Sequence, residues 1–236
     1  FTSIQNQGKS NEKPRYRSLC KNQGTDQGNQ WKTKVVDLVY KKSTGAEGML
    51  ERLDEVCKES EQAIEDGFSF LVLSDKNIND ENIALSSFLA CSTVHHYLVK
   101  AQKRTRIGII IESGESREVH HHCLLTGYGA DAINPYLAFE ALWDRHSAGA
   151  FNEIKSASEI AVNYKKAVGK GMLKVMAKMG ISTLHSYKGA QIFEAVGLAK
   201  EVIDLCFAGT ASRIEGANFE VLSREMREKH SIGFPK

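Results

Sequence analysis

The sequence lacks an excess of charge of either sign, a long apolar run and any closely spaced pair of cysteines. Its 236 residues include 31 basic and 29 acidic side chains, a formal net charge of +2. Such a balance gives no broad electrostatic field for nucleic acid or anionic lipid, so we expect neither as a partner. No uninterrupted apolar stretch approaches the ~20 residues that cross a bilayer, and we expect no membrane association.

The cysteines are odd in number and widely separated, and none forms a C-x-x-C pair. The sequence therefore offers no zinc ribbon and no local iron–sulfur motif. Because the cysteines are embedded in apolar segments, we expect reduced, buried thiols in a soluble intracellular protein. The chain begins at Phe1 without a signal-peptide pattern, which suits a processed protein or an excised piece of a longer one. The cysteines are Cys20, Cys57, Cys91, Cys123 and Cys206.

Two regions differ in composition. Residues 1–30 contain five Gln, four Asn and three Gly but few large apolar side chains. Such a segment cannot bury enough surface to offset the entropy lost on ordering, so we predict a flexible N-terminal arm or linker. Residues 31–236 have the alternating apolar and polar pattern of a folded domain, and 42% of the whole chain is hydrophobic. We expect one α/β domain there.

Short apolar runs alternate with longer helical segments along residues 31–236. This alternation predicts an α/β fold with a mostly parallel sheet flanked by helices. The right-handed crossover rule favours an open layer or an incomplete (β/α) barrel. We expect strands at 34–40, 68–73, 106–112, 130–134 and 181–184. We expect helices at 49–64, 85–100, 117–126, 135–146, 158–179, 190–196, 201–206 and 218–230, with Gly169 and Gly171 interrupting the helix at 158–179 and Gly180 ending it.

Two histidine clusters raise the question of a metal site: His95–His96, and His120, His121 and His122. Neighbouring residues on a helix point ~100° apart, whereas zinc ligands on a helix share one face, as at i and i+4. No third ligand lies at a recognised spacing, so the sequence favours imidazoles that pack between helices and find hydrogen-bond partners. We expect no metal ligands.

Residues 127–132 match the dinucleotide fingerprint G-x-G-x-x-A. That fingerprint must follow a strand and open a helix, so that the pyrophosphate meets free backbone N–H groups. Here the glycines follow a predicted helix and lead into a predicted strand. The pattern therefore indicates a helix stop rather than a nucleotide site.

Acidic side chains gather after the strongest predicted strand, where Glu112, Glu115 and Glu118 flank Ser113 and Arg117. Loops at the carboxyl ends of parallel strands hold ligands in α/β folds, so this cluster has the most favourable position for function. A general base cannot be told from a salt-bridged carboxylate without its partner. We favour a structural or interdomain ion pair.

Lysines recur at every fourth position over 166–178 and would share one helix face. The stripe lacks the interleaved aromatics of single-strand binders, which favours a solvated face over an anion or acidic-partner patch. There is no P-loop, and spacing alone assembles no Ser–His–Asp or Cys–His catalytic group.

Long strings of the sequence resemble one known family. Residues 105–143 (TRIGIIIESGESREVHHHCLLTGYGADAINPYLAFEALW), 166–198 and 202–220 are similar, in order, to the central region of the large chain of glutamate synthase. The likeness begins near Trp31 and continues to the final GFPK.

The resemblance implies that the chain is part of a longer enzyme with an amidotransferase domain, an FMN-binding synthase barrel and a β-helix. That enzyme converts glutamine and 2-oxoglutarate into two glutamates, with reducing equivalents delivered through a three-iron cluster to FMN. Position 1 is Phe, where the family has its nucleophilic cysteine. No position here matches the catalytic, FMN or cluster motifs, so we expect this chain to bind no cofactor.

The resemblance and the residues together predict a structural, connecting role between the amidotransferase and FMN-binding synthase domains. We expect residues 117–129 (REVHHHCLLTGYG) to form an interdomain contact surface, with Arg117, Glu118, His120 and His121 as its members. Two alternatives remain open. One is a stand-alone binding or regulatory module that uses the lysine stripe or the histidines, and the other is a metal-dependent enzyme.

Overall fold

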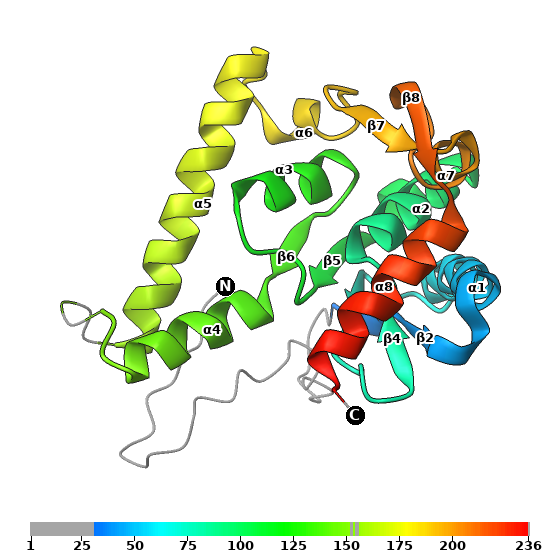
Figure 1. The fold of residues 1–236 in the computed structure, drawn as a ribbon. Coiled ribbons are helices and arrows are strands. Elements are labelled where there is room, and N and C mark those ends of the chain that lie inside the picture. Colours follow the sequence, from blue (N-terminus) through cyan, green and yellow to red (C-terminus); the bar gives the residue numbers. More distant parts are fainter. Residues whose placement is uncertain (1–30, 152, 154–155, 236) are drawn as a thin grey trace.

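The computed structural model describes residues 31–151, 153 and 156–235. The predicted arm at 1–30 lies outside the described residues. Within them the chain folds as α/β, with a mostly parallel sheet flanked by helices (Figure 1). The fold class expected from the sequence is therefore confirmed.

A four-stranded parallel sheet forms the centre of the fold, with strands in the order β1-β3-β5-β6. Spatial order thus follows chain order, and right-handed crossovers place the connecting helices on the same face of such a sheet. This is the arrangement of a barrel wall rather than a doubly wound sheet. The strands are β1 (Thr33–Asp37), β3 (Phe70–Ser74), β5 (Gly108–Glu112) and β6 (Ala132–Asn134).

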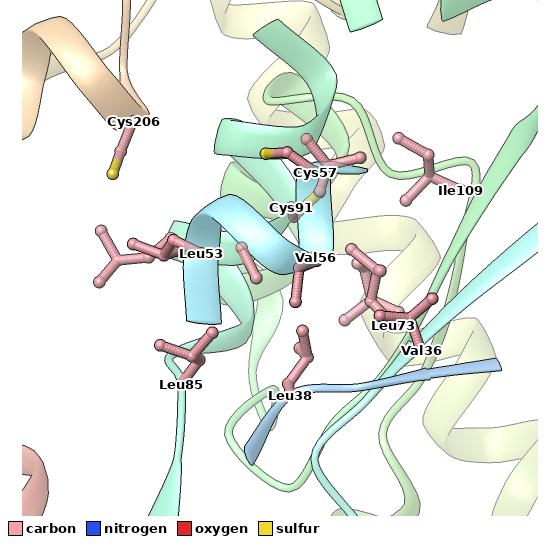
Figure 2. Packing of buried hydrophobic residues seen from close by; sticks show 14 of the residues in the cluster. Val36, Leu38, Leu53, Val56, Cys57, Leu73, Leu85, Cys91, Ile109 and Cys206 are labelled. Atoms are coloured by element: carbon pink, nitrogen blue, oxygen red, sulfur yellow. The ribbon is translucent and has the colours of Figure 1, made fainter. Parts of the chain in front are cut away.

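The main core lies between this wall and helices α1 (Gly45–Glu65) and α2 (Ser87–Lys100). The apolar residues of α1 recur every three to four positions, so one face of the helix is buried. Figure 2 shows Val56 of α1 close to Leu38 and on the side of the strand residue Leu73. Leu73 and Ile109 have no exposed surface, which explains why their strands are apolar almost throughout.

The barrel wall does not close. Strands β7 (Glu194–Leu198) and β8 (Ala211–Ala217) form a separate parallel pair, joined by helix α7 (Lys200–Cys206). Across the described ranges this pair shares no ladder with the four-stranded sheet. The parallel strands therefore make an incomplete (β/α) barrel.

A second layer of helices lies beside the sheet, and α5 stands along one side of the molecule (Figure 1). Helix α3 (Val119–Gly127) packs against α5 (Ala157–Met179), which also contacts α4 (Tyr136–Ser147). The predicted interruption of α5 is wrong, because the helix continues through both glycines. Its end is as predicted, with Gly180 in the left-handed conformation at φ +71°.

Gly171 has a packing role instead of a breaking one. A Cβ atom at this position would lie 2.3 Å from Cγ2 of Val119, so only glycine lets α5 approach α3 this closely. Gly169, on the same helix, has open space around its Cα. The two glycines therefore differ in function although their sequence contexts are alike.

Three further expectations about the elements need correction. The strand expected at 34–40 divides at the buried Leu38 into β1 and β2 (Val39–Lys41), and β2 pairs antiparallel with β4 (Asn82–Ala84). The strand expected at 181–184 does not form: residues 181–183 are neither helix nor strand, and Leu184 begins helix α6 (Leu184–Tyr187), whose first turn is capped by the Thr183 hydroxyl.

The helix expected at 190–196 does not form: residues 190–193 are neither helix nor strand, and 194–196 begin strand β7, whose parallel pairing with β8 decides its conformation. Helix α8 (Phe219–Gly233), capped by Asn218, agrees with the expectation and packs on α1 (Figure 1).

Candidate functional site

The carboxyl ends of β3, β5 and β6 bring polar side chains together at one edge of the sheet. Ser74, Glu112 and Asn134 lie side by side in the strand register. The Glu112 carboxylate is 2% exposed and accepts hydrogen bonds from the Ser74 hydroxyl at 2.8 Å and the Asn134 amide at 3.0 Å. The Lys76 ammonium lies 3.1 Å from Oε1, the oxygen that also accepts from Asn134, whereas Ser74 donates to Oε2. Glu112 therefore forms a structural ion pair with Lys76, which is the interpretation that we favoured.

A second buried carboxylate, Asp75, holds the loop between β5 and α3. It accepts hydrogen bonds from the Ser113 hydroxyl at 2.8 Å and the Gly114 backbone N–H at 2.9 Å. Burial raises the pKa of Asp75, and hydrogen bonds from Ser113 and Tyr136 oppose the rise. Sequence reasoning missed Asp75, which directly follows the observed strand β3 but lies two residues beyond the strand predicted at 68–73.

The other two glutamates of the predicted cluster cap helices. One oxygen of Glu115 accepts from the Ser87 backbone N–H at 2.8 Å and from its hydroxyl at 2.9 Å, at the start of α2. Glu118 is the N-cap of α3, and His121 completes a reciprocal capping box. The Nδ1 atom of His121 accepts the backbone N–H of Arg117 at 3.1 Å. These two carboxylates therefore stabilise helix ends.

The four residues expected to form an interdomain contact lie together at the beginning of α3. Arg117, Glu118 and His120 are exposed, whereas His121 is half-buried by its capping role. The structure brings them into one surface, which we call the α3 entry surface (Arg117, Glu118, His120, His121). Whether another domain covers this surface is a proposal, developed below.

A groove of about 400 Å³ opens beside the α3 entry surface, and we call it the α2–α8 groove. It lies where the start of α2, the β5–α3 loop, the first turns of α3 and the end of α8 meet. Sequence reasoning missed it, because Lys229 of α8 is far from the others along the chain and no local pattern marks it. Its lining residues include Phe88, Glu115, Ser116, Arg117, Leu124 and Lys229.

Two other histidines of the predicted clusters, His122 and His95, have structural hydrogen bonds. His122 is buried, its Nδ1 lies 2.9 Å from the Glu118 carbonyl oxygen, and burial lowers its pKa. His95 accepts a hydrogen bond from the Arg104 guanidinium at 3.0 Å, and burial, aided by that guanidinium, lowers its pKa to about 4. In the part of the chain that the structure covers, no group of three or more His, Cys, Asp or Glu could hold a metal.

The glycine pattern at 127–132 is a helix stop, as expected. Gly127 ends α3, and Gly129 has φ +113° before strand β6 begins. A Cβ at Gly129 would lie 2.3 Å from Nδ1 of His95, so the turn is filled by protein side chains rather than open to a phosphate.

The lysines of α5 and the described cysteines have opposite environments. Lys166, Lys170, Lys174 and Lys178 are all exposed and form no ion pair within the described ranges.

Four cysteines are free and buried, and burial raises the pKa of the Cys57 and Cys91 thiols to about 12. Such thiols are protonated near neutral pH and are poor nucleophiles. Cys20 lies outside the described residues.

No described helix combines the length and apolar character that crossing a membrane demands.

Comparison with known proteins identifies relatives over most of the chain. The family described as "Glutamate synthase central domain" matches residues 12–199. The chain is 47% identical over 205 residues to a glutamate synthase [NADH] of Schizosaccharomyces pombe, covering 87% of this chain and 10% of that protein. It is 42% identical over 199 residues to the glutamate synthase [NADPH] large chain of Bacillus subtilis, covering 84% and 13%.

A ferredoxin-dependent glutamate synthase of Pyropia yezoensis is 39% identical over 209 residues, covering 84% of this chain and 14% of that protein. Among solved structures, a flavocytochrome b2 variant with sulfite bound aligns with a TM-score of 0.45 at 14% identity, covering 78% of this chain and 43% of that one. The chain thus spans only about a tenth to a seventh of the length of these curated relatives. On the sequence matches, it belongs to the glutamate synthase central domain family.

Proposed function

We propose that this chain holds the amidotransferase and FMN-binding synthase domains of a glutamate synthase in register. The parent would convert glutamine and 2-oxoglutarate into two glutamates, as the relatives' names suggest. The chain itself would be a connecting scaffold, inactive alone. Family membership and the small share of each relative that the chain covers support this role.

The observation that carries the proposal is that the carboxylates at the strand ends bind other groups of the same chain. Glu112 is paired with Lys76, Asp75 holds the β5–α3 loop, and Glu115 caps α2. Acid–base catalysis requires a group that can reach substrate with a proton to give or take. Here each acid is held by neighbours of the same chain, whereas Arg117 and His120 beside them are exposed.

The described residues do not suit the cofactors of the parent enzyme. The turn at Gly129 is filled by His95, which leaves no cradle for the phosphate of FMN. An iron–sulfur cluster needs several cysteine thiolates around one centre, whereas these cysteines are buried on separate elements. We therefore place FMN and the three-iron cluster in other parts of the parent chain.

The test uses the intact parent enzyme and measures how glutaminase and synthase activities are coupled. We expect Arg117→Ala and His120→Ala to increase the ammonia released to solvent per glutamate formed, because a loosened contact lets the two sites work independently. The matched control is Lys170→Ala, an exposed change on α5 outside the α3 entry surface. Unchanged coupling in both variants, with the control also normal, would count against the proposal.

A further inference from the structure

The α2–α8 groove carries two cations that the described chain leaves unpaired. Arg117, just before α3, and Lys229 of α8 line the groove and are exposed, and neither side chain makes an ion pair or hydrogen bond with the residues that the structure describes. The one acidic lining residue, Glu115, binds the start of α2 through its Oε2 atom. The groove therefore presents positive charge, to which a negatively charged group is complementary.

A buried hydroxyl in the lining also lacks a partner. Ser116 is 1% exposed, and its Oγ atom makes no hydrogen bond among the described residues. Buried polar groups are nearly always satisfied, so an unpaired hydroxyl at a groove indicates a missing partner. A carboxylate is an acceptor that suits both a hydroxyl and a guanidinium.

The lining also contains apolar side chains. Phe88 is half-buried and Leu124 partly exposed within the groove. Protein interfaces combine an apolar centre with a polar rim. The groove is open to solvent along one side rather than an enclosed pocket, which favours a protein segment over a small ligand.

We infer that the α2–α8 groove receives an acidic segment of an adjoining domain of the parent chain. An Asp or Glu of that segment lies between Arg117 and Lys229, within reach of the Ser116 hydroxyl, and an apolar neighbour covers Phe88 and Leu124. This inference rests on the proposed function, because it names the chemistry of the partner at the same contact. Most of each relative's length lies outside the matched region, so the rest of the parent chain is long enough to supply such a segment.

The test is zero-length cross-linking of the intact parent enzyme with a water-soluble carbodiimide, followed by peptide mass spectrometry. The reagent activates a carboxyl group, an adjacent lysine amine displaces the urea, and an amide bond forms. We expect Lys229 to be joined to an Asp or Glu outside residues 1–236. The internal pair Lys103–Glu61, at 2.7 Å, provides the positive control in the same digest.

Lys229→Arg keeps the charge but removes the amine, so the cross-link disappears while coupling stays normal. Lys229→Glu increases ammonia release severalfold, and reversing the charge of the identified acid restores coupling. An unlinked Lys229 beside a clear Lys103–Glu61 product overturns the inference, as does a link to a carboxyl group within residues 1–236. If coupling is still lost in Arg117→Ala, the interdomain contact stands and only its acidic partner is wrong.

Discussion

Two buried carboxylates at the sheet edge have different partners. Glu112 has a cationic partner in Lys76, whereas Asp75 is surrounded by neutral donors, the Ser113 hydroxyl and the Gly114 N–H. Burial disfavours a charge that no opposite charge compensates. The pKa of Asp75 is therefore raised above its usual 3.8 despite its hydrogen bonds.

This raised pKa gives Asp75 a defined effect on stability. The folded state holds the proton more tightly than the unfolded state, so the free energy of unfolding falls as pH rises from about 4 through the folded pKa. In Asp75→Asn the side chain cannot ionise, and we expect a flatter pH dependence over this window. Urea unfolding at several pH values measures it, with Asp204→Asn on the surface of α7 as the control.

An equal slope in wild type and Asp75→Asn would show that Asp75 keeps an ordinary pKa in the fold. A lower stability of the variant at every pH, with the slope still flattened, would only measure the altered hydrogen bonds to Ser113 and Gly114.

Among the elements, the pair α3 and α5 determines how the α3 entry surface is held. Val119 begins α3, and its branched side chain meets α5 at Gly171. Tyr164 of α5 donates a hydrogen bond from its hydroxyl to the Arg117 carbonyl oxygen at 2.8 Å. Helix α5 thus supports the very turn that presents Arg117 to solvent.

Two alanine substitutions on α5 should have opposite effects. Gly171→Ala would press a methyl group onto Val119, whose χ1 is stiff, and we expect a loss of about 1–3 kcal/mol in the free energy of unfolding. Gly169→Ala meets nothing within 4 Å, and the better helix former should add about 0.5–1 kcal/mol. Urea unfolding measures both, and equal effects of the same sign would show that α5 does not contact α3 closely.

The elements also show what local pattern could and could not predict. The strands β3 and β5 were predictable because continuous apolar runs match burial on both faces. Strand β8 was missed, since most of its residues are exposed and its alternation carries no hydrophobic signal. Strand β7 was taken for helix because its pairing with β8 is decided about 17 residues further along the chain.

The candidate site likewise has parts that the sequence could predict and parts that it could not. Arg117, Glu118, His120 and His121 were predictable from one contiguous segment, and the structure places them on one surface. The capping box of Glu118 and His121 is also local, whereas the α2–α8 groove depends on α2 and α8, which no local pattern brings together. Residues joined only by tertiary packing were thus beyond sequence reasoning.

At the scale of the whole molecule, the chain is an incomplete barrel. The carboxylates at its strand ends form hydrogen bonds within the domain. Barrels of this kind ordinarily place their chemistry in the loops after the strands. Here those loops are tied down by Glu112, Asp75 and Glu115. Positions that bind a substrate in other barrels thus hold this domain's own loops in place.

The most direct measurement of the central claim is made on the purified chain itself, supplied with FMN, glutamine, 2-oxoglutarate and a chemical reductant. After gel filtration we expect the protein to carry no flavin absorbance and to form no glutamate above a protein-free blank. Bovine serum albumin in the same mixture controls for loosely adsorbed flavin. A chain that elutes yellow with a stoichiometric flavin, or that makes glutamate, would contradict the account of a scaffold.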